Sequence, residues 1–215
     1  AEGPVGPIFF FSYARPARLP AQAGGIDNDP AKEVNRFFAD LTNTVNQLVP
    51  VPAGADVGFM DRGMESGVEW HDELFRNLGL ARVFVALLSA QYLEISKWCP
   101  MEWHYFSRRQ VRLLEGAPPR PNATAVIPVL WAPVVSQMPS TVQRVQQFSP
   151  SKESLRPLYE SEGALGMQSL DESAYKAFVW LLAREIQNRS AHLDVKPSTH
   201  RATLGLHQSF QDADW

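Results

Sequence analysis

Short apolar runs alternate with longer stretches of helical periodicity along this 215-residue chain. The strand-like runs occupy residues 8–13, 56–60, 80–88 and 125–131. Residues 8–13 form a short continuous apolar run, which is typical of a strand buried on both faces of a parallel sheet. Between the strand-like runs, apolar residues recur every three or four positions, as in helices with one buried face. This alternation predicts an α/β domain with a central parallel β-sheet and helices on both sides.

The last part of the chain follows this pattern less closely. Pro128 interrupts the final apolar run, and a proline in a strand indicates an edge or a bulge because it has no N–H to donate. Periodicity is weak between residues 132 and 165, where we expect a short helix at 141–148 and an irregular strand at 155–159. Residues 175–186 then form a clear amphipathic helix. Residues 191–215 have no periodicity, so we expect one domain over residues 5–190 and a linker or tail over 191–215.

Composition narrows the class of protein. Hydrophobic residues make up 45% of the chain and charged residues 20%, which is ordinary for a soluble globular protein. The net charge is −3 and the basic residues are scattered, so no nucleic-acid surface is expected. One cysteine and five scattered histidines provide no disulfide and no metal-ligand spacing.

Cellular location and context are expectations from the same sequence. No apolar run has the length of a membrane span and no secretion signal is visible, so we expect a cytoplasmic protein without membrane contact. The chain begins at Ala1 rather than at a methionine. We therefore expect it to be part of a longer protein with other domains.

Candidate chemistry concentrates in residues 96–102, Ser-Lys-Trp-Cys-Pro-Met-Glu, directly after the most strand-like run. A proline inside the first turn marks the start of a helix. We expect Glu102 within that turn, where the helix dipole favours an ionised carboxylate, at the sheet edge where ligands of open α/β folds bind. The alternative is that Glu102 only complements the dipole and that Trp98 belongs to the core.

The ordered set of motifs resembles the TIR (Toll/interleukin-1 receptor) domain family. Residues 10–13, Phe-Phe-Ser-Tyr, are similar to its box 1, and residues 61–67 to its BB loop. Residues 87–89 and 127–129 resemble the ends of its third and fourth strands, and residues 96–102 match its S-x-W-C-x-x-E signature. The resemblance is closest to bacterial TIR and TIR-like domains. It implies a flavodoxin-like three-layer fold with five parallel strands.

This chain departs from the family pattern at three places. The loop after box 1 is longer than usual, residues 65–67 are Glu-Ser-Gly where Pro-Gly is common, and no fifth strand is recognisable. The first departure affects how a ligand would enter, and the second puts the usual BB-loop contacts in doubt.

Enzymatic TIR domains cleave NAD⁺ between nicotinamide and ribose, and the resemblance maps their essential glutamate onto Glu102. NAD⁺ would be the substrate, and no cofactor is implied. Nicotinamide leaves as a neutral molecule, so the main difficulty is the positive charge that develops on the ribose. A carboxylate about 4 Å away, at an effective dielectric near 20, would stabilise that charge by about 4 kcal/mol, or roughly a thousandfold in rate. An ionised carboxylate suits this role.

Four further residues are candidates for contacts with NAD⁺. By resemblance Tyr13 and Arg15 would line the nucleotide cleft, although a solvated loop arginine is the commoner outcome. Ser89 is a candidate ribose contact, but serine is common at strand ends. Trp98 either stacks on a base or nicotinamide ring or packs between helix and sheet.

Two functions remain open. One is an NAD⁺ glycohydrolase or cyclase that acts in bacterial immunity and is activated by self-association. The other is an interaction module without chemistry that uses the loop beginning at Asp61 and Arg62, which would orient the loop, reach a neighbouring subunit, or form a local ion pair. The discriminating feature is whether Glu102 faces an open cleft or is sealed by packing. Hydrolysis and cyclisation differ in whether water or a ribose hydroxyl reaches the cation first.

Overall fold

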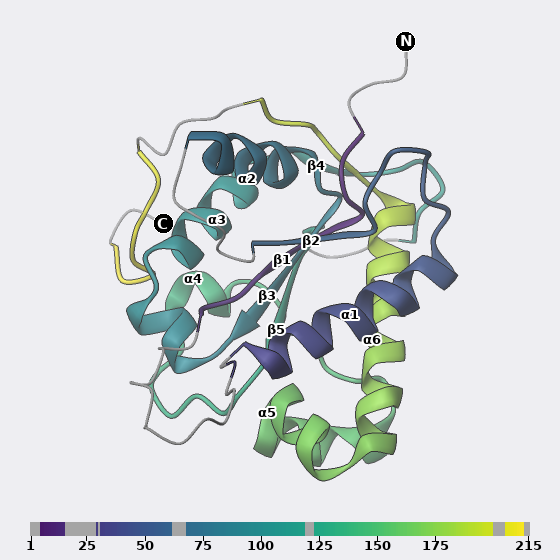
Figure 1. Ribbon diagram of the computed structural model, residues 1–215, viewed down its shortest axis with the longest axis vertical. Coiled ribbons are helices and arrows are strands. Elements are labelled where there is room, and N and C mark those ends of the chain that lie inside the picture. The colour runs from purple at the N-terminus through teal and green to yellow at the C-terminus, as the bar shows by residue number, and fades with distance from the viewer. Residues whose placement is uncertain are drawn as a thin grey trace.

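The protein is represented by a computed structural model that describes residues 5–15, 29, 31–61, 68–118, 123–199 and 205–212. Its centre is a four-stranded parallel sheet in the order β2-β1-β3-β5 (Figure 1). These strands are β1 (Phe9–Ser12), β2 (Gly58–Met60), β3 (Val83–Leu88) and β5 (Val126–Leu130). The predicted flavodoxin-like α/β architecture with a central parallel sheet is therefore confirmed.

Helices cover both faces of the sheet, as Figure 1 shows. One side carries α1 (Lys32–Leu48), α5 (Arg156–Leu170) and α6 (Glu172–His192), and the other carries α2 (Val68–Leu80) and α3 (Trp98–Ser107). Successive strand residues point to opposite faces. Phe9 and Phe11 accordingly pack in the core with Phe37, whereas Phe10 stacks on Phe84 in the second core at 5.7 Å. Both faces are buried, which is why the strand run is continuously apolar.

Short helical pieces complete the connections. A π-helical turn (Gln91–Ile95) leads from β3 to α3, α4 (Ser140–Gln143) follows β5, and a 3₁₀ turn (Glu153–Leu155) leads into α5. The irregular strand predicted at residues 155–159 is wrong, because these residues are helical. Pro157 lies at the start of α5, where its fixed φ favours a helix and its missing N–H needs no partner.

The prediction that Pro128 marks an edge is confirmed, because β5 is the outermost strand. On the open side of β5, Phe148 donates its N–H to the Pro128 carbonyl at 2.8 Å, and Leu130 donates its N–H to the Tyr159 hydroxyl at 2.7 Å. Arg189 donates to the carbonyls of residues 124 and 126. In the part of the chain that the structure describes, the parallel sheet has four strands rather than the expected five. These contacts use the backbone groups that a fifth strand would pair with.

Residues 193–199 and 205–212 belong to the segment expected as a linker or tail, but they pack on the domain. Strand β6 (Leu193–Val195) pairs with β4 (Val111–Leu113) in a two-stranded antiparallel sheet. The Arg109 guanidinium fastens this segment by donating to the carbonyls of Val195 and Lys196. Farther along, Phe210 is buried in the core beside α3. A three-residue strand and one isolated aromatic residue have no periodicity, so the sequence pattern did not reveal them.

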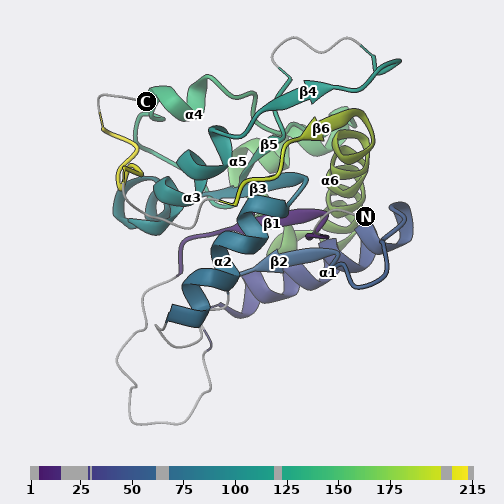
Figure 2. The same cartoon turned by 90° about the horizontal axis from the view of Figure 1, so that it is seen from above.

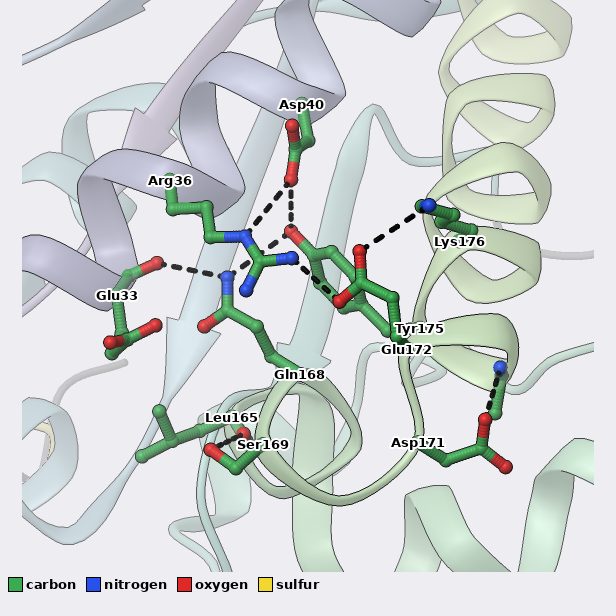
Figure 3. Close-up of polar contacts among 11 residues, drawn as sticks. Glu33, Arg36, Asp40, Leu165, Gln168, Ser169, Asp171, Glu172, Tyr175 and Lys176 are labelled. Atoms are coloured by element: carbon green, nitrogen blue, oxygen red, sulfur yellow. Dashed lines mark hydrogen bonds and ion pairs between the residues drawn. The ribbon is translucent and has the colours of Figure 1, made fainter.

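A group of polar side chains connects α1, α5 and α6 on one side of the sheet (Figure 3). We call Arg36, Asp40, Gln168, Glu172 and Tyr175 the α1–α6 polar cluster. Arg36 donates to Glu172 at 2.6 Å, and the Tyr175 hydroxyl donates to Asp40 at 2.8 Å. Gln168 donates to the Tyr175 hydroxyl at 3.3 Å. These bonds connect helices whose apolar faces already share one core.

Candidate active site

Glu102 lies in α3 and its side chain meets the carboxyl end of β1. The Ser12 hydroxyl, on the last residue of β1, donates to Oε2 of Glu102 at 2.5 Å. The Ser12 oxygen also lies 3.0 Å from the Tyr92 hydroxyl, which comes from the π-helical turn after β3. Cys99 is buried one turn before Glu102 and is electrostatically coupled to it. We call Ser12, Tyr92, Cys99 and Glu102 the Glu102 cluster.

The Glu102 cluster is shielded from solvent. Glu102 is 5% exposed and Tyr92 is 0% exposed. Burial raises the pKa of Glu102 from 4.5 to about 8, and the Ser12 hydrogen bond opposes that rise. Burial likewise raises the pKa values of Cys99 and Tyr92 well above their ordinary values. Among the described residues, none forms an ion pair with Glu102.

Two expectations about Glu102 are therefore wrong in this arrangement. The first is its place in the helix: α3 begins at Trp98, and its first turn has no acidic residue. The dipole effect falls off within the first turn, so it stabilises the carboxylate less than expected. The second is accessibility, because Glu102 points inward onto β1 and is sealed by packing. Burial, which disfavours the charged form, dominates its protonation.

A charged rim lies next to the cluster. Arg15, in the loop after β1, forms an ion pair with Asp61 at 2.7 Å, and their side chains are 50% and 16% exposed. Burial raises the pKa of Tyr13, and Arg15, Asp61 and Glu102 all influence it electrostatically. The structure thus brings together four predicted site residues from three separate stretches of the chain. The local ion pair considered for Asp61 is formed with Arg15, and Arg62 lies outside the described residues.

Ser89 and Trp98 make other contacts. The Ser89 hydroxyl accepts a hydrogen bond from the backbone N–H of Tyr92 and so caps the π-helical turn. Trp98 is 37% exposed, and its ring lies 5.3 Å from the ring of His71 on α2. In this arrangement Ser89 supports the turn that carries Tyr92, and Trp98 lies at the surface between α2 and α3.

Sequence reasoning did not select Ser12 or Tyr92. Ser12 could have been found, because a serine that ends a run of phenylalanines in a strand buried on both faces is a polar group that needs a partner. Tyr92 gave no such signal. Its role depends on the π-helical turn that points its hydroxyl at Ser12.

A cavity of about 790 Å³ lies elsewhere, between residues 146–151 and the second half of α6. Its lining includes Trp180, Arg184 and Asn188, and none of the predicted site residues. In the described ranges, no group of three or more His, Cys, Asp or Glu side chains is arranged to hold a metal ion. No helix in those ranges combines the length and apolarity needed to cross a membrane.

Comparison with known families agrees with the fold. The family model described as "TIR domain" matches residues 42–158, more than half of the chain. The chain belongs to the TIR domain family. The matched range includes Asp61 and Glu102, and the structure adds Ser12, Tyr13 and Arg15 from the strand and loop before it. No curated protein and no solved structure matches this chain.

Proposed function

We propose that this TIR domain is an NAD⁺ glycohydrolase with Glu102 as its catalytic residue, and that the arrangement described here is its resting state. The observation that carries the proposal is a single buried carboxyl group at the carboxyl edge of the parallel sheet, hydrogen-bonded by Ser12 and adjacent to Tyr13, Arg15 and Asp61. A titratable group with a strongly perturbed pKa at such an edge is a candidate for chemistry.

The reaction would require Glu102 in its ionised form. The bond between ribose C1′ and the nicotinamide nitrogen breaks, and its electron pair stays on the nitrogen, so nicotinamide leaves neutral. The Glu102 carboxylate would stabilise the oxocarbenium ion by about 4 kcal/mol at about 4 Å and an effective dielectric near 20. Water then adds to C1′ and loses a proton, which yields ADP-ribose. Addition of a ribose hydroxyl of the same molecule would yield a cyclic isomer.

The resting state follows from the protonation of Glu102. With a pKa of about 8, roughly nine tenths of the carboxyl groups are protonated and neutral at pH 7. A neutral acid does not stabilise a ribosyl cation. We therefore propose that self-association opens the site, hydrates Glu102 and lowers its pKa. In a bacterial host such an enzyme would act as an immune effector or signal producer.

A second candidate is an interaction module without chemistry. The observation that favours it is the sealing of Glu102, because an open cleft in front of Glu102 was the feature expected of an enzyme and sealing by packing the feature expected of an interaction module. In this case the TIR domain would recruit another TIR domain, and the buried carboxyl group would have no role in turnover.

Nicotinamide release separates the two functions. The purified chain is incubated with NAD⁺ in dilute solution and under crowding, beside Glu102→Gln and the surface control Glu172→Gln. If the chain is a glycohydrolase, cleavage of NAD⁺ should increase with crowding. The cleavage rate should fall roughly a thousandfold in Glu102→Gln and stay unchanged in the control. Silence of all three proteins under every condition supports the interaction module. Equal cleavage by the wild type and Glu102→Gln would reject Glu102 as the catalytic residue. Chromatography of the products distinguishes hydrolysis from cyclisation.

A further inference from the structure

The C-terminal segment 205–212 lies beside α3, the helix that carries Glu102, in both views of the molecule (Figures 1 and 2). Phe210 anchors it and is 3% exposed. Its ring stacks on Tyr92 at 5.7 Å and meets Trp103 edge-on at 5.8 Å. Phe210 therefore covers the ring of a residue that belongs to the Glu102 cluster.

A second contact fixes the same segment to α3. The backbone N–H of His207 donates to Nδ1 of His104 at 2.9 Å, and the two imidazole rings stack at 4.2 Å. Asp212 forms an ion pair with His207 at 3.2 Å when that histidine is protonated. The segment is thus attached to α3 by a buried phenylalanine and by a histidine pair.

The direction of the hydrogen bonds connects Phe210 to Glu102. Ser12 has one hydroxyl hydrogen and donates it to Glu102. The 3.0 Å contact between Ser12 and Tyr92 must then have Tyr92 as the donor. Consecutive donors polarise one another, so the Tyr92 hydroxyl strengthens the bond that Ser12 makes to the carboxyl group. Phe210 stacks on the ring of the same tyrosine.

We propose that Tyr92 is a positioning residue for Glu102, acting through the Ser12 hydroxyl, and that Phe210, in the docked C-terminal segment, keeps the Glu102 cluster sealed from water. The effect on the carboxyl group stands on these contacts alone. The effect on turnover rests on the NAD⁺ glycohydrolase proposed above.

The first test removes the phenylalanine side chain. In Phe210→Ala, Tyr92 loses its stacking partner and water gains access to the cluster, so Glu102 should titrate about one pH unit lower. Carbon-detected NMR of the glutamate carboxyl groups, assigned with Glu102→Gln, measures this. A fall from about 8 to about 7 would raise the ionised fraction, and hence NAD⁺ cleavage at pH 7, about fivefold.

Phe148→Ala is the matched control. Phe148 also comes from an irregular segment and packs against a tyrosine and a second aromatic ring, Tyr159 and Phe178, in the other core. It should lower stability while leaving the Glu102 titration unchanged. A general loosening of the fold would instead move Glu102 alike in both variants.

Tyr92→Phe tests the hydrogen-bond chain without opening a cavity. The ring and its stacking on Phe210 remain, but Ser12 loses the donor behind it. Its bond to the carboxylate weakens, so Glu102 should titrate higher than in the wild type and cleavage at pH 7 should fall. Opposite shifts in Tyr92→Phe and Phe210→Ala are not expected from a merely structural role.

The outcomes separate the two proposals. The seal by Phe210 is overturned if Phe210→Ala titrates like the wild type or like Phe148→Ala. The positioning role of Tyr92 is overturned if Tyr92→Phe leaves the Glu102 pKa unchanged. If both shifts occur but no variant cleaves NAD⁺ under any condition, the positioning role stands and the glycohydrolase fails. If the wild type cleaves NAD⁺ and neither shift occurs, the glycohydrolase stands and the positioning role fails.

Discussion

Glu102 and Asp40 each accept a hydrogen bond from a hydroxyl group, and the surroundings of these two carboxyl groups are opposite. In the Glu102 cluster, Ser12 donates to a glutamate that is 5% exposed. In the α1–α6 polar cluster, Tyr175 donates to Asp40, whose side chain is 42% exposed and lies 3.7 Å from Arg36. The hydrogen bond to Glu102 thus lies in a buried site where no described residue forms an ion pair with the acid, whereas the hydrogen bond to Asp40 lies beside an exposed arginine.

The surroundings of the two clusters have opposite effects on the charges of their residues. At the α1–α6 polar cluster, the hydrogen bond to Glu172 raises the pKa of Arg36 and lowers that of Glu172, so both keep their ordinary charges more firmly. At the Glu102 cluster, burial opposes the ordinary charge of the acid. Groups held against their own ionisation preference concentrate at functional sites. A count of ion pairs would indicate the α1–α6 polar cluster as the functional site. The burial of an acid against its ordinary charge indicates the Glu102 cluster instead.

The largest predicted effect is on how stability depends on pH. Glu102 releases its proton near pH 4.5 in the unfolded chain but near pH 8 in the folded one, so the folded chain binds one more proton between these values. Relative to Glu102→Gln, the free energy of unfolding of the wild type should therefore fall as pH rises through this window, by about 4 to 5 kcal/mol at most. Urea denaturation of both proteins between pH 4.5 and 9 measures it, and parallel curves would show that Glu102 is not buried as described.

A smaller effect on the free energy of unfolding is expected from removal of the Tyr175 hydroxyl. Tyr175→Phe removes the donor to Asp40 and the acceptor for Gln168, whose side chain is buried. We expect a loss of about 1 to 2 kcal/mol in the free energy of unfolding, measured by urea denaturation at pH 7. The pH window assigned to Glu102 should persist in this variant, since Tyr175 does not titrate there. Loss of the window would mean that the two clusters are coupled.

The smallest effect is expected at the exposed ion pair. Glu172 pairs with Arg36 at 2.6 Å and with Lys176 at 3.5 Å, but all three side chains are exposed, by 42% to 73%. Solvation and salt screen such pairs, so Glu172→Gln should leave the urea midpoint unchanged within error. A clear loss that disappears at high salt would show that this network stabilises the domain more than its exposure indicates.

The sequence predicted the sheet better than the site. Phe9, Phe10 and Phe11 are apolar at successive positions, which is typical of a strand covered on both faces, and Pro128 indicated an edge or a bulge in the strand that proved to be outermost. The motif around Glu102 identified the right segment for a TIR domain. The sequence pattern could not show that Glu102 is sealed from solvent. Ser12, Tyr92 and Phe210 converge on this site from distant parts of the chain, and local periodicity contains no information about such contacts.

The sequence by itself determined the order along the chain of the four parallel strands and of the helices between them, an edge or bulge at Pro128, and the position of Glu102 after the third of these strands. It could do so because periodicity and backbone chemistry depend on neighbouring residues. Only the tertiary structure decided that Glu102 is buried with a raised pKa, that Arg15 pairs with Asp61, and that Phe210 covers Tyr92. Burial and the pKa shift that follows from it depend on which distant side chains displace water around a residue. Only the tertiary packing of the chain determines which side chains these are.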